Sequence, residues 1–550
     1  MPVYKTPGVY VEEISTLPPS VAEVATAVPA FVGYTEIGPA DTADPVVARV
    51  SSLLEFKTQF GRSQRMKFKL NVDAGGATAV PLAPAANFAL YHAVSHYFKN
   101  GGGPCYVASV GSYAAMPSKA RFIDGLGAIA KEDEPTLLVL TDAACTLAAG
   151  DYYGVCAEAL GQCQSLGDRF TILDVHSGKW DDFRNDPSLS INLSYGAAYH
   201  PYLQTTLGYE YDDADVAIVR AGAKPVSVSG SLMLGGASGL LVSFSGSPGS
   251  TPAVAIIAGT KAATPSFAVA GQTLTLSDIK SNTGADIASA WVTWKKSNSS
   301  AGFDLGVAGD GSAVVATADA TATPIVLPGA AADTLASIKN SETALYNAAR
   351  SAIDGQRLVL PPSAAVAGVY ARVDREQGVW KAPGNVGVLA VLGPVAKITN
   401  DEQDRLNVDD TAGKSINAIR AFTGKGTLVW GARTLAGNDN EWRYVSVRRL
   451  FITIEESSRK ATAFAVFEAN DATTWLKVKA MIESYLYGLW ERGALAGPKP
   501  EAAYYVNVGL GQTMTPQDVL EGRMVVEIGI AAVRPAEFIV LRFSHKLQTE

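Results

Sequence analysis

The chain has 550 residues, more than one hydrophobic core can hold, so we expect about two to four domains. Apolar residues make up 47% of the chain and charged residues 18%, a balance that excludes an intrinsically disordered protein. The formal net charge is −8 and no lysine–arginine run occurs, which argues against a nucleic-acid binder that acts mainly through its charge.

The first strand-like run, residues 9–14, lies between Pro7-Gly8 and Pro18-Pro19. Because the prolines separate it from any continuous helix or sheet, the run is either an arm that pairs with a sheet elsewhere or a frayed end. The start of the chain lacks the apolar segment of a signal peptide. No stretch of about 20 apolar residues predicts a membrane span, and we therefore expect assembly in the cytoplasm.

From about residue 26 to residue 222, short apolar strands alternate with helices. Strands are predicted at residues 30–34, 105–110, 136–140 and 170–175, and helices at residues 86–99, 117–131 and 149–166. Because these strands are apolar without alternation, both faces of their sheet should be covered by helices. The pattern predicts an α/β (α+β) fold.

The composition changes between about residues 223 and 328, where Ser, Gly, Thr, Ala and Val dominate. The spacing of strand-like runs predicts a small all-β domain, with strands at residues 239–245, 253–259, 266–276 and 291–295. A predicted helix over residues 332–353 leads back to the α/β part. The β-rich segment is therefore expected to be an insertion.

The character changes again from about residue 393. Long helices are predicted at residues 442–468 and 472–492; the second has Asp471 as N-cap and Gly493 as its stop. Strands are predicted at residues 504–508, 524–530 and 538–543. The last of these is strongly apolar.

Motifs that carry chemistry are weak throughout the chain. His92 and His96 have the spacing of two zinc ligands on a helix, but Ala93 stands where a metalloprotease has its glutamate, so packing is the simpler interpretation. Gly101–103 follow a helix and precede a strand, the reverse of a phosphate loop, and predict a helix stop. Gly424-Lys425-Gly426-Thr427 lacks the upstream glycine of a P-loop and predicts a turn.

The four cysteines, Cys105, Cys145, Cys156 and Cys163, form no C-x-x-C pair and are expected to be free thiols in a reducing compartment. No catalytic set emerges from the residues, so we expect no enzyme, no cofactor and no metal site. A carboxylate pair cannot be located from sequence, and an α/β hydrolase stays an alternative. A carbohydrate- or cell-binding protein that uses Trp291 and Trp294 is another.

Motifs in a fixed order run along the chain. They are TPGVYVEEI at residues 6–14, AFVGY at 30–34 with Gly38-Pro39, PPSAAVAGVYAR at 361–372 with VWKAPGN at 379–385, YVSVRRL at 444–450, WERGALAG at 490–497 and VRPAEFIV at 533–540. The set resembles the contractile tail sheath proteins of phages and related injection systems. The resemblance leaves out residues 223–328. Ala364 stands where the family often has glycine, which affects only the local turn.

The resemblance implies a structural subunit that stacks in hexameric rings around an inner tube and contracts to drive the tube through a target envelope. It implies a division into an N-terminal arm (1–25), an α/β sheath core (26–222 and 329–392), an inserted β-rich surface domain (223–328), a C-terminal polymerisation domain (393–532) and a C-terminal arm (533–550). Implied partners are further copies of the chain, the tube protein, baseplate and terminal cap proteins, and other sheath paralogues, with no nucleic acid and no membrane insertion.

In this family the arms add strands to neighbouring subunits, and β-augmentation of this kind draws its affinity from main-chain hydrogen bonds. The arm strands expected here are Val9, Tyr10, Val11, Glu12, Glu13 and Ile14, and Phe538, Ile539, Val540, Leu541, Arg542 and Phe543. A positive helix face could grip an acidic tube weakly. The candidates are Arg443, Arg448, Arg449, Arg459, Lys460, Lys477 and Lys479.

The resemblance fits a phage tail, a tailocin or an extracellular injection system, and the particle would be assembled in the bacterial cytoplasm. A type VI apparatus fits less well, because its sheath is usually split into two chains.

Overall fold

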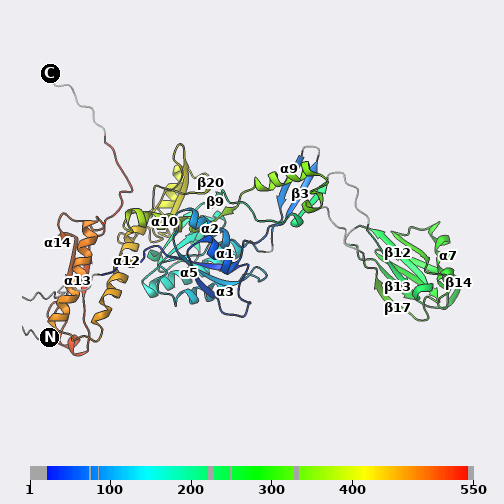
Figure 1. Cartoon of the computed structure of the whole chain (residues 1–550), viewed down its shortest axis with the longest axis horizontal. Helices are drawn as coiled ribbons and strands as arrows, with labels where there is room; N and C mark the ends of the chain where they lie inside the picture. Colours follow the sequence, from blue (N-terminus) through cyan, green and yellow to red (C-terminus); the bar gives the residue numbers. More distant parts are fainter. Residues whose placement is uncertain are drawn as a thin grey trace, which may run out of the picture. The chain divides into compact units, whose positions relative to one another are not determined.

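A computed structural model describes residues 21–73, 76–84, 86–220, 228–247, 250–327 and 334–542 (Figure 1). The chain divides into two compact units. The first unit comprises Met1–Met66, Ala83–Glu210 and Asp354–Glu550, and the second comprises Lys67–Leu82 and Tyr211–Ile353. No helix of the described residues has the length and apolar character required to cross a bilayer.

A nine-stranded sheet forms the centre of the first unit, in the order β19-β22-β21-β8-β7-β6-β1-β5-β2. Six of these strands are parallel: β1 (Pro29–Thr35), β5 (Cys105–Ser112), β6 (Leu137–Val139), β7 (Phe170–Asp174), β8 (Gly196–His200) and β21 (Ile416–Phe422). Antiparallel strands close both edges: β2 (Val46–Val50), β22 (Gly426–Val429) and β19 (Val386–Gly387).

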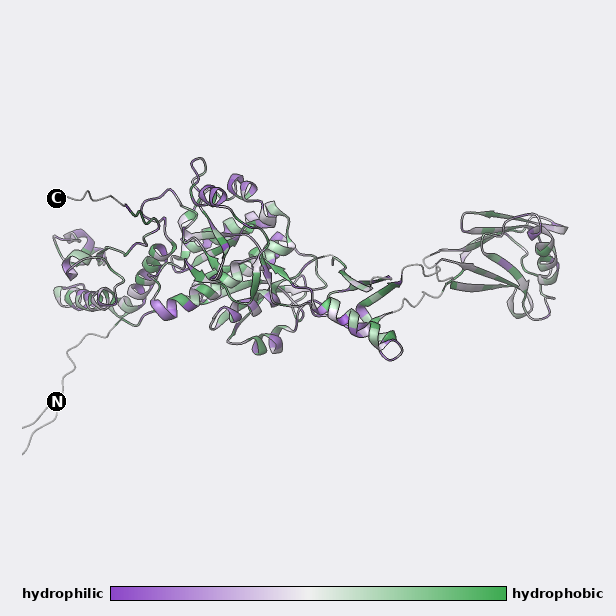
Figure 2. Cartoon of the chain, turned by 90° about the horizontal axis from the view of Figure 1, so that it is seen from above, coloured by the Kyte–Doolittle hydropathy of each residue, from purple (hydrophilic) through white to green (hydrophobic). Residues whose placement is uncertain are grey.

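Helices cover both faces of this sheet, and its strands are therefore buried on both sides. One core joins the sheet to α1 (Leu53–Phe60), α2 (Leu90–Lys99) and α10 (Ser363–Gln377). The other core joins it to α3 (Lys119–Ile129), α4 (Thr141–Thr146), α5 (Ala149–Leu166) and α6 (Trp180–Asn185). In the hydropathy colouring of Figure 2, apolar colour follows the strands between these helices. The expected α/β (α+β) class is confirmed.

Smaller elements complete this body: the sheet β18-β9-β20, made of Val359–Leu360, Leu203–Thr205 and Val391–Pro394, and the helix α11 (Asn400–Asn407). The predicted strands match β1, β5, β6 and β7, but α2 begins only at Leu90, four residues after the predicted start. Ala364 lies in the first turn of α10 and is buried, so the alanine fits the local turn there.

The C-terminal part of the first unit forms a lobe, which we call the C-terminal lobe (residues 445–532). It consists of α12 (Val445–Ala461), α13 (Ala472–Glu491), α14 (Pro500–Ala503), β23 (Tyr504–Asn507), α15 (Pro516–Leu520) and β24 (Glu527–Ile530). The two long helices pack through an apolar core that includes Leu450, Ile454, Ile482 and Leu486. The first helix was predicted to reach residue 468; it ends at Ala461, where a 3-10 turn (Thr462–Ala465) follows.

The second unit contains the sheet β10-β3-β4, made of Val216–Arg220, Phe68–Asp73 and Gly76–Pro81, with the helices α8 (Leu335–Ile338) and α9 (Thr343–Asp354). Its second group of elements has its own apolar core. This group, called the inserted sandwich (residues 228–327), comprises two sheets and one helix: β11 (Val228–Leu234), β12 (Leu240–Gly246) and β16 (Phe303–Val307); β13 (Ala253–Ile257), β14 (Lys261–Ala270), β15 (Thr273–Ile279) and β17 (Ala320–Pro324); and α7 (Gly284–Lys295).

Three predictions for this unit are wrong. The run 291–295 is the end of the helix α7, because Thr283 and Asp286 form a capping box that starts a helix before it. The run 266–276 crosses a turn between the antiparallel strands β14 and β15. The single helix predicted over 332–353 is the pair α8 and α9.

The predicted domain boundaries stay a prediction. The strands β21 and β22, which follow residue 393, pair into the central sheet.

Candidate functional site: an assembly interface

The C-terminal tail of the described chain exposes four apolar side chains in succession. Phe538, Ile539, Val540 and Leu541 are each 71–80% exposed, and none of them belongs to a strand of this chain. Contiguous exposed apolar residues of this kind mark a surface that another molecule covers. Arg542 follows, while Phe543 and the predicted N-terminal arm strand, residues 9–14, lie outside the described residues.

The C-terminal lobe contains an incompletely covered apolar groove. Only two strands, β23 and β24, form its sheet, and residues 504–507 pair with residues 527–530. A two-stranded sheet is marginally stable by itself and offers backbone groups at its outer edges. Between this sheet and the two long helices lies a groove of about 800 Å³, whose apolar lining includes Val466, Phe467, Ile482, Met524, Val526 and Ile528.

The tip of this groove is unusually exposed. Phe467 has a positive backbone φ of 68° and a fully exposed ring, and Val466 beside it is 65% exposed. A phenylalanine in the left-handed region carries a backbone cost. The lobe therefore holds a large apolar side chain at its surface, next to a sheet that can accept further strands.

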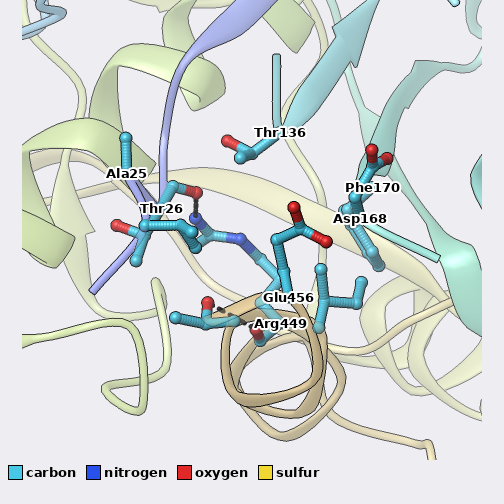
Figure 3. Close-up of a pocket in the computed structure, with 10 residues that line it drawn as sticks. Ala25, Thr26, Thr136, Asp168, Phe170, Arg449 and Glu456 are labelled. Carbon is cyan, nitrogen blue, oxygen red and sulfur yellow. Dashed lines mark hydrogen bonds between the residues drawn. The ribbon is translucent and has the colours of Figure 1, made fainter. Parts of the chain in front are cut away.

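The N-terminal segment enters the first unit along α12. The amide of Val24 donates to Ser457 Oγ (3.3 Å), and that of Val28 donates to Thr136 Oγ1 (3.0 Å). Figure 3 shows Arg449, on α12, pointing to the backbone of Thr26, whose carbonyl it contacts at 2.7 Å. The chain after residue 21 is thus fixed to both the lobe and the sheet body.

A cavity of about 10 Å³ lies at this junction, enough for roughly one water molecule. Asp168, Glu456 and Arg449 line it together with apolar atoms (Figure 3). The Glu456 carboxylate is buried and pairs with Arg459 and Lys460 of its own helix. The charges at the junction are therefore largely compensated within the chain.

Two of the basic residues predicted to grip a tube lie in the interior. Arg448 and Arg449 are 5% and 3% exposed. The Arg448 guanidinium lies 4.2 Å from the ring centre of Tyr195 and 4.4 Å from that of Trp442. In this chain both arginines stabilise the fold and do not form an exposed helix face.

The other basic candidates reach the surface in part or in full: Arg443, Arg459, Lys460, Lys477 and Lys479. Lys460 Nζ is 2.6 Å from a carboxylate oxygen of Asp133. Lys479 lies 3.7 Å from Glu483 on the same helix. Lys477 is exposed and forms no ion pair with any residue that the structure describes. Its contact with a tube stays a prediction, as do those of the other four.

The crevice at the carboxyl ends of the parallel strands is filled by side chains of the chain itself. The strand order β5-β1-β6-β7-β8 reverses between β1 and β6, the place where open α/β sheets bind ligands. There the Asp142 carboxylate accepts hydrogen bonds from the amides of Tyr34 (2.8 Å), Ala89 (2.6 Å) and Leu90 (3.2 Å). A Cβ at Gly33 would lie 2.6 Å from this carboxylate, so the close approach requires glycine.

Burial dominates the electrostatics of these interior groups. It raises the pKa of Asp142 to about 6, although three amide donors oppose the shift. It lowers the pKa of His92 and of His96 to about 4, and His96 Nε2 lies 3.2 Å from the carbonyl of Leu389. Among the described residues no group of three or more His, Cys, Asp or Glu side chains has a geometry suited to a metal ion.

Sequence reasoning missed the groove residues and the interior role of the two arginines. Val466 and Phe467 follow the 3-10 turn after α12, and Ile528 lies in β24. Only the apolar character of these residues was visible in the sequence. The exposed tail, by contrast, was visible as an apolar run directly after a Pro-Ala-Glu segment.

Two family models match the chain. The model of the phage tail sheath C-terminal domain matches residues 437–546, and that of the phage tail sheath protein central domain matches residues 274–435. The second match begins inside the segment 223–328, which the sequence resemblance had left out. Its start falls in β15, so part of the inserted sandwich is included in the match.

Curated relatives are tail sheath proteins. The chain is 25% identical to the tail sheath protein of Vibrio phage KVP40 over 185 residues, 34% of this chain and 26% of the relative. It is also 25% identical to that of Enterobacteria phage T4 over 188 residues, 34% of this chain and 27% of the relative. The matched part thus spans about a quarter of the length of these two phage proteins.

Solved structures match over nearly the whole chain. The baseplate structure of the anti-feeding prophage contains a chain with a TM-score of 0.56 and 26% identity, covering 99% of this chain and 100% of that one. The sheath complex of the extracellular contractile injection system PVC, in its contracted state, contains a chain with a TM-score of 0.54 and 26% identity, covering 99% of both chains.

Proposed function

Because this chain belongs to the phage tail sheath protein family, we propose that it is a structural subunit of a contractile sheath, which polymerises around an inner tube and drives it through a target envelope. Membership of a family of structural sheath proteins agrees with the expectation that the chain is not an enzyme. The single observation that carries the assembly role is the exposed apolar tail at residues 538–541.

The tail and the groove complement each other chemically. Residues 538–541 offer four exposed apolar side chains outside any helix or strand, and β24 lies beside an apolar groove that its own chain does not fill. A strand from a neighbouring copy that pairs with this sheet would bury apolar side chains and satisfy edge amides and carbonyls at the same time. We propose that residues 538–543 of one copy, and residues 9–14 of another, pair as strands with the β23–β24 sheet beside this groove.

Shared strands also explain how a sheath can move without falling apart. The body of each subunit can rotate and slide as a rigid unit while the strands keep neighbours connected. The tube, baseplate and cap proteins are the proposed further partners, and the particle is a phage tail or a related contractile device assembled in the bacterial cytoplasm.

Disulfide trapping between two preparations tests the strand exchange. One carries Val540→Cys in the tail and the other carries Val526→Cys in the groove. Cys105, Cys156 and Cys163 are buried, and the partly exposed Cys145 is replaced by Ser in both preparations. The proposal predicts disulfide-linked heterodimers when the two proteins are mixed and polymerised. A mixture of Val540→Cys with Leu54→Cys, an exposed position on α1, serves as the control and should give none.

A cross-link that forms only when both cysteines are on the same chain would contradict strand exchange, because the tail would then fold onto its own lobe. Equal trapping with the α1 control would show non-specific contact and would count against the proposal in the same way.

A further inference from the structure

The C-terminal segment is tied to the first unit at several points before it becomes exposed. The amide of Ala496 donates to the carbonyl of Ala531 (2.7 Å), and that of Val533 donates to the carbonyl of Ala494 (3.3 Å). Arg534 Nη1 then reaches the carbonyl of Asn440 (2.7 Å) in an exposed contact. These contacts follow the segment from the lobe back toward the sheet body.

The last tie is the carboxylate of Glu537. Arg433 holds it with two nitrogens, Nε to Oε1 at 2.9 Å and Nη2 to Oε2 at 2.6 Å. Asn407 Nδ2 donates to Oε1 (2.7 Å), and the Tyr444 hydroxyl donates to Oε2 (3.1 Å). A carboxylate with a forked arginine and two further donors is held in one geometry, because charge-assisted bidentate bonds are strong and directional.

The acceptor site for Glu537 is built into the body. The Arg433 side chain is 4% exposed. The backbone amide of Arg433 donates to Asn417 Oδ1 (2.8 Å), and Arg433 Nη1 donates to the carbonyl of Asn407 (3.2 Å). Burial raises the pKa of the Glu537 carboxyl, but the bonds from Arg433 and Asn407 outweigh burial, so its pKa lies below the ordinary value. The carboxylate is therefore charged when it is bound at neutral pH.

The chain changes character directly after this contact. Glu537 is partly buried, whereas Phe538 and the next three residues are more than 70% exposed. We propose that the Glu537–Arg433 pair is a latch that sets where the C-terminal arm leaves the body, and hence its free length. This inference rests on the proposed function.

Opening the latch would lengthen the arm by a defined amount. The next tie is the bond from Arg534 to the Asn440 carbonyl, so residues 535–537 would join the free segment and add roughly 10–11 Å of extended chain. A subunit that slides past its neighbour needs such slack if the shared strand is to stay paired. The latch thus gives the arm a short state and a long state without loss of the strand contact.

Distance measurements between spin labels test the latch in the unassembled full-length protein. Nitroxides are attached at Ile539→Cys and at Leu54→Cys, and the distribution is compared between the unchanged latch, Glu537→Gln and Glu537→Ala. We expect a narrow distribution with the latch present and a broadening on the order of 10 Å in both variants, larger for Ala. Glu441→Gln, an exposed glutamate near Asn440, should leave the distribution narrow.

Equally narrow distributions in Glu537→Gln and Glu537→Ala would overturn the latch. The measurement does not require polymerisation. A chain that never polymerises would therefore contradict the proposed function but would not change the result on the latch. A thermal unfolding scan of each variant separates local release of the tail from loss of the fold.

Discussion

Arg449 on α12 and Asp374 on α10 form a bidentate ion pair, with Nη1 3.0 Å from Oδ1 and Nη2 2.6 Å from Oδ2. Both side chains are at most 4% exposed, and the same guanidinium lies 4.7 Å from the ring centre of Tyr370. It also contacts the carbonyl of Thr26. One buried arginine therefore joins the N-terminal segment, the sheet body and the C-terminal lobe.

Removal of this arginine should destabilise the fold strongly. Arg449→Ala leaves Asp374 buried without its partner, and an uncompensated buried charge costs about 3–5 kcal/mol. We expect Lys477→Ala, at an exposed residue on α13, to change the free energy of unfolding by less than about 0.5 kcal/mol. Chemical denaturation of both variants checks this, and equal stabilities would show that the ion pair is not structural.

Truncation after Glu537 should abolish polymerisation and leave the subunit folded. The removed residues that the structure describes are exposed and belong to no strand of this chain, so the melting temperature should stay within a few degrees. Deletion of residues 1–16 should have the same effect on assembly. Electron microscopy and calorimetry provide the readouts, and normal sheaths from either truncated protein would contradict the arm model.

Tube binding should depend on exposed lysines of α13 and not on the buried arginines. We predict that Lys477→Glu weakens co-sedimentation with an acidic tube at low salt, by a modest factor because exposed ion pairs contribute about 0–1 kcal/mol each. Self-assembly without a tube should be unchanged. A Lys477→Glu protein that binds the tube as tightly as the parent would remove this residue from the contact.

The inserted sandwich should be dispensable for the fold of the rest of the chain. It has its own core, centred on residues such as Trp291, Leu274 and Val242. Deletion of residues 228–327, with a short glycine–serine linker in their place, should leave the melting transition of the first unit and its polymerisation intact. The isolated segment should unfold cooperatively by circular dichroism. Aggregation of the shortened chain during expression would argue that the sandwich supports folding.

Stability should fall as the pH rises through the pKa of a buried aspartate. Burial raises the pKa of Asp174 to about 7, although Ser363 donates to its carboxylate through the amide (2.8 Å) and the hydroxyl (2.5 Å). Because the Asp174 carboxyl has a higher pKa in the folded chain than in the unfolded chain, its protonation stabilises the fold. This stabilisation is complete below the unfolded pKa of about 4 and is lost as the pH rises through the folded pKa of about 7.

Asp174→Asn removes this titration and keeps a hydrogen-bonding side chain of the same size. The loss of unfolding free energy between pH 5 and pH 8 should therefore be smaller in the variant, by about 2–3 kcal/mol. Denaturant titrations at the two pH values measure it. An identical pH dependence in both proteins would show that the carboxyl does not titrate in this range.

Much of the central sheet could be predicted, because runs such as residues 105–110 and 170–175 are apolar on both faces and only a covered parallel sheet accommodates them. The helix α7 was missed because Trp291 and its neighbours are strand-forming types, while the capping signal lies eight residues earlier at Thr283.

The interior role of Arg449 could not be predicted from the helix pattern. Its partner Asp374 lies 75 positions away on another helix, and only the folded chain brings the two together. The same holds for Glu537 and Arg433, which are 104 positions apart. The exposed tail was predictable because its apolar run is continuous in the sequence; which strand accepts it depends on β23 and β24 as folded.

The most direct measurement is a cryo-EM structure of the polymer formed by the purified full-length chain. The account predicts that residues 538–543 form a strand hydrogen-bonded to the β23–β24 sheet of a different copy, above the groove lined by Val526 and Ile528. It would be contradicted by a tail that pairs with the sheet of its own chain, or by a protein that stays monomeric at high concentration.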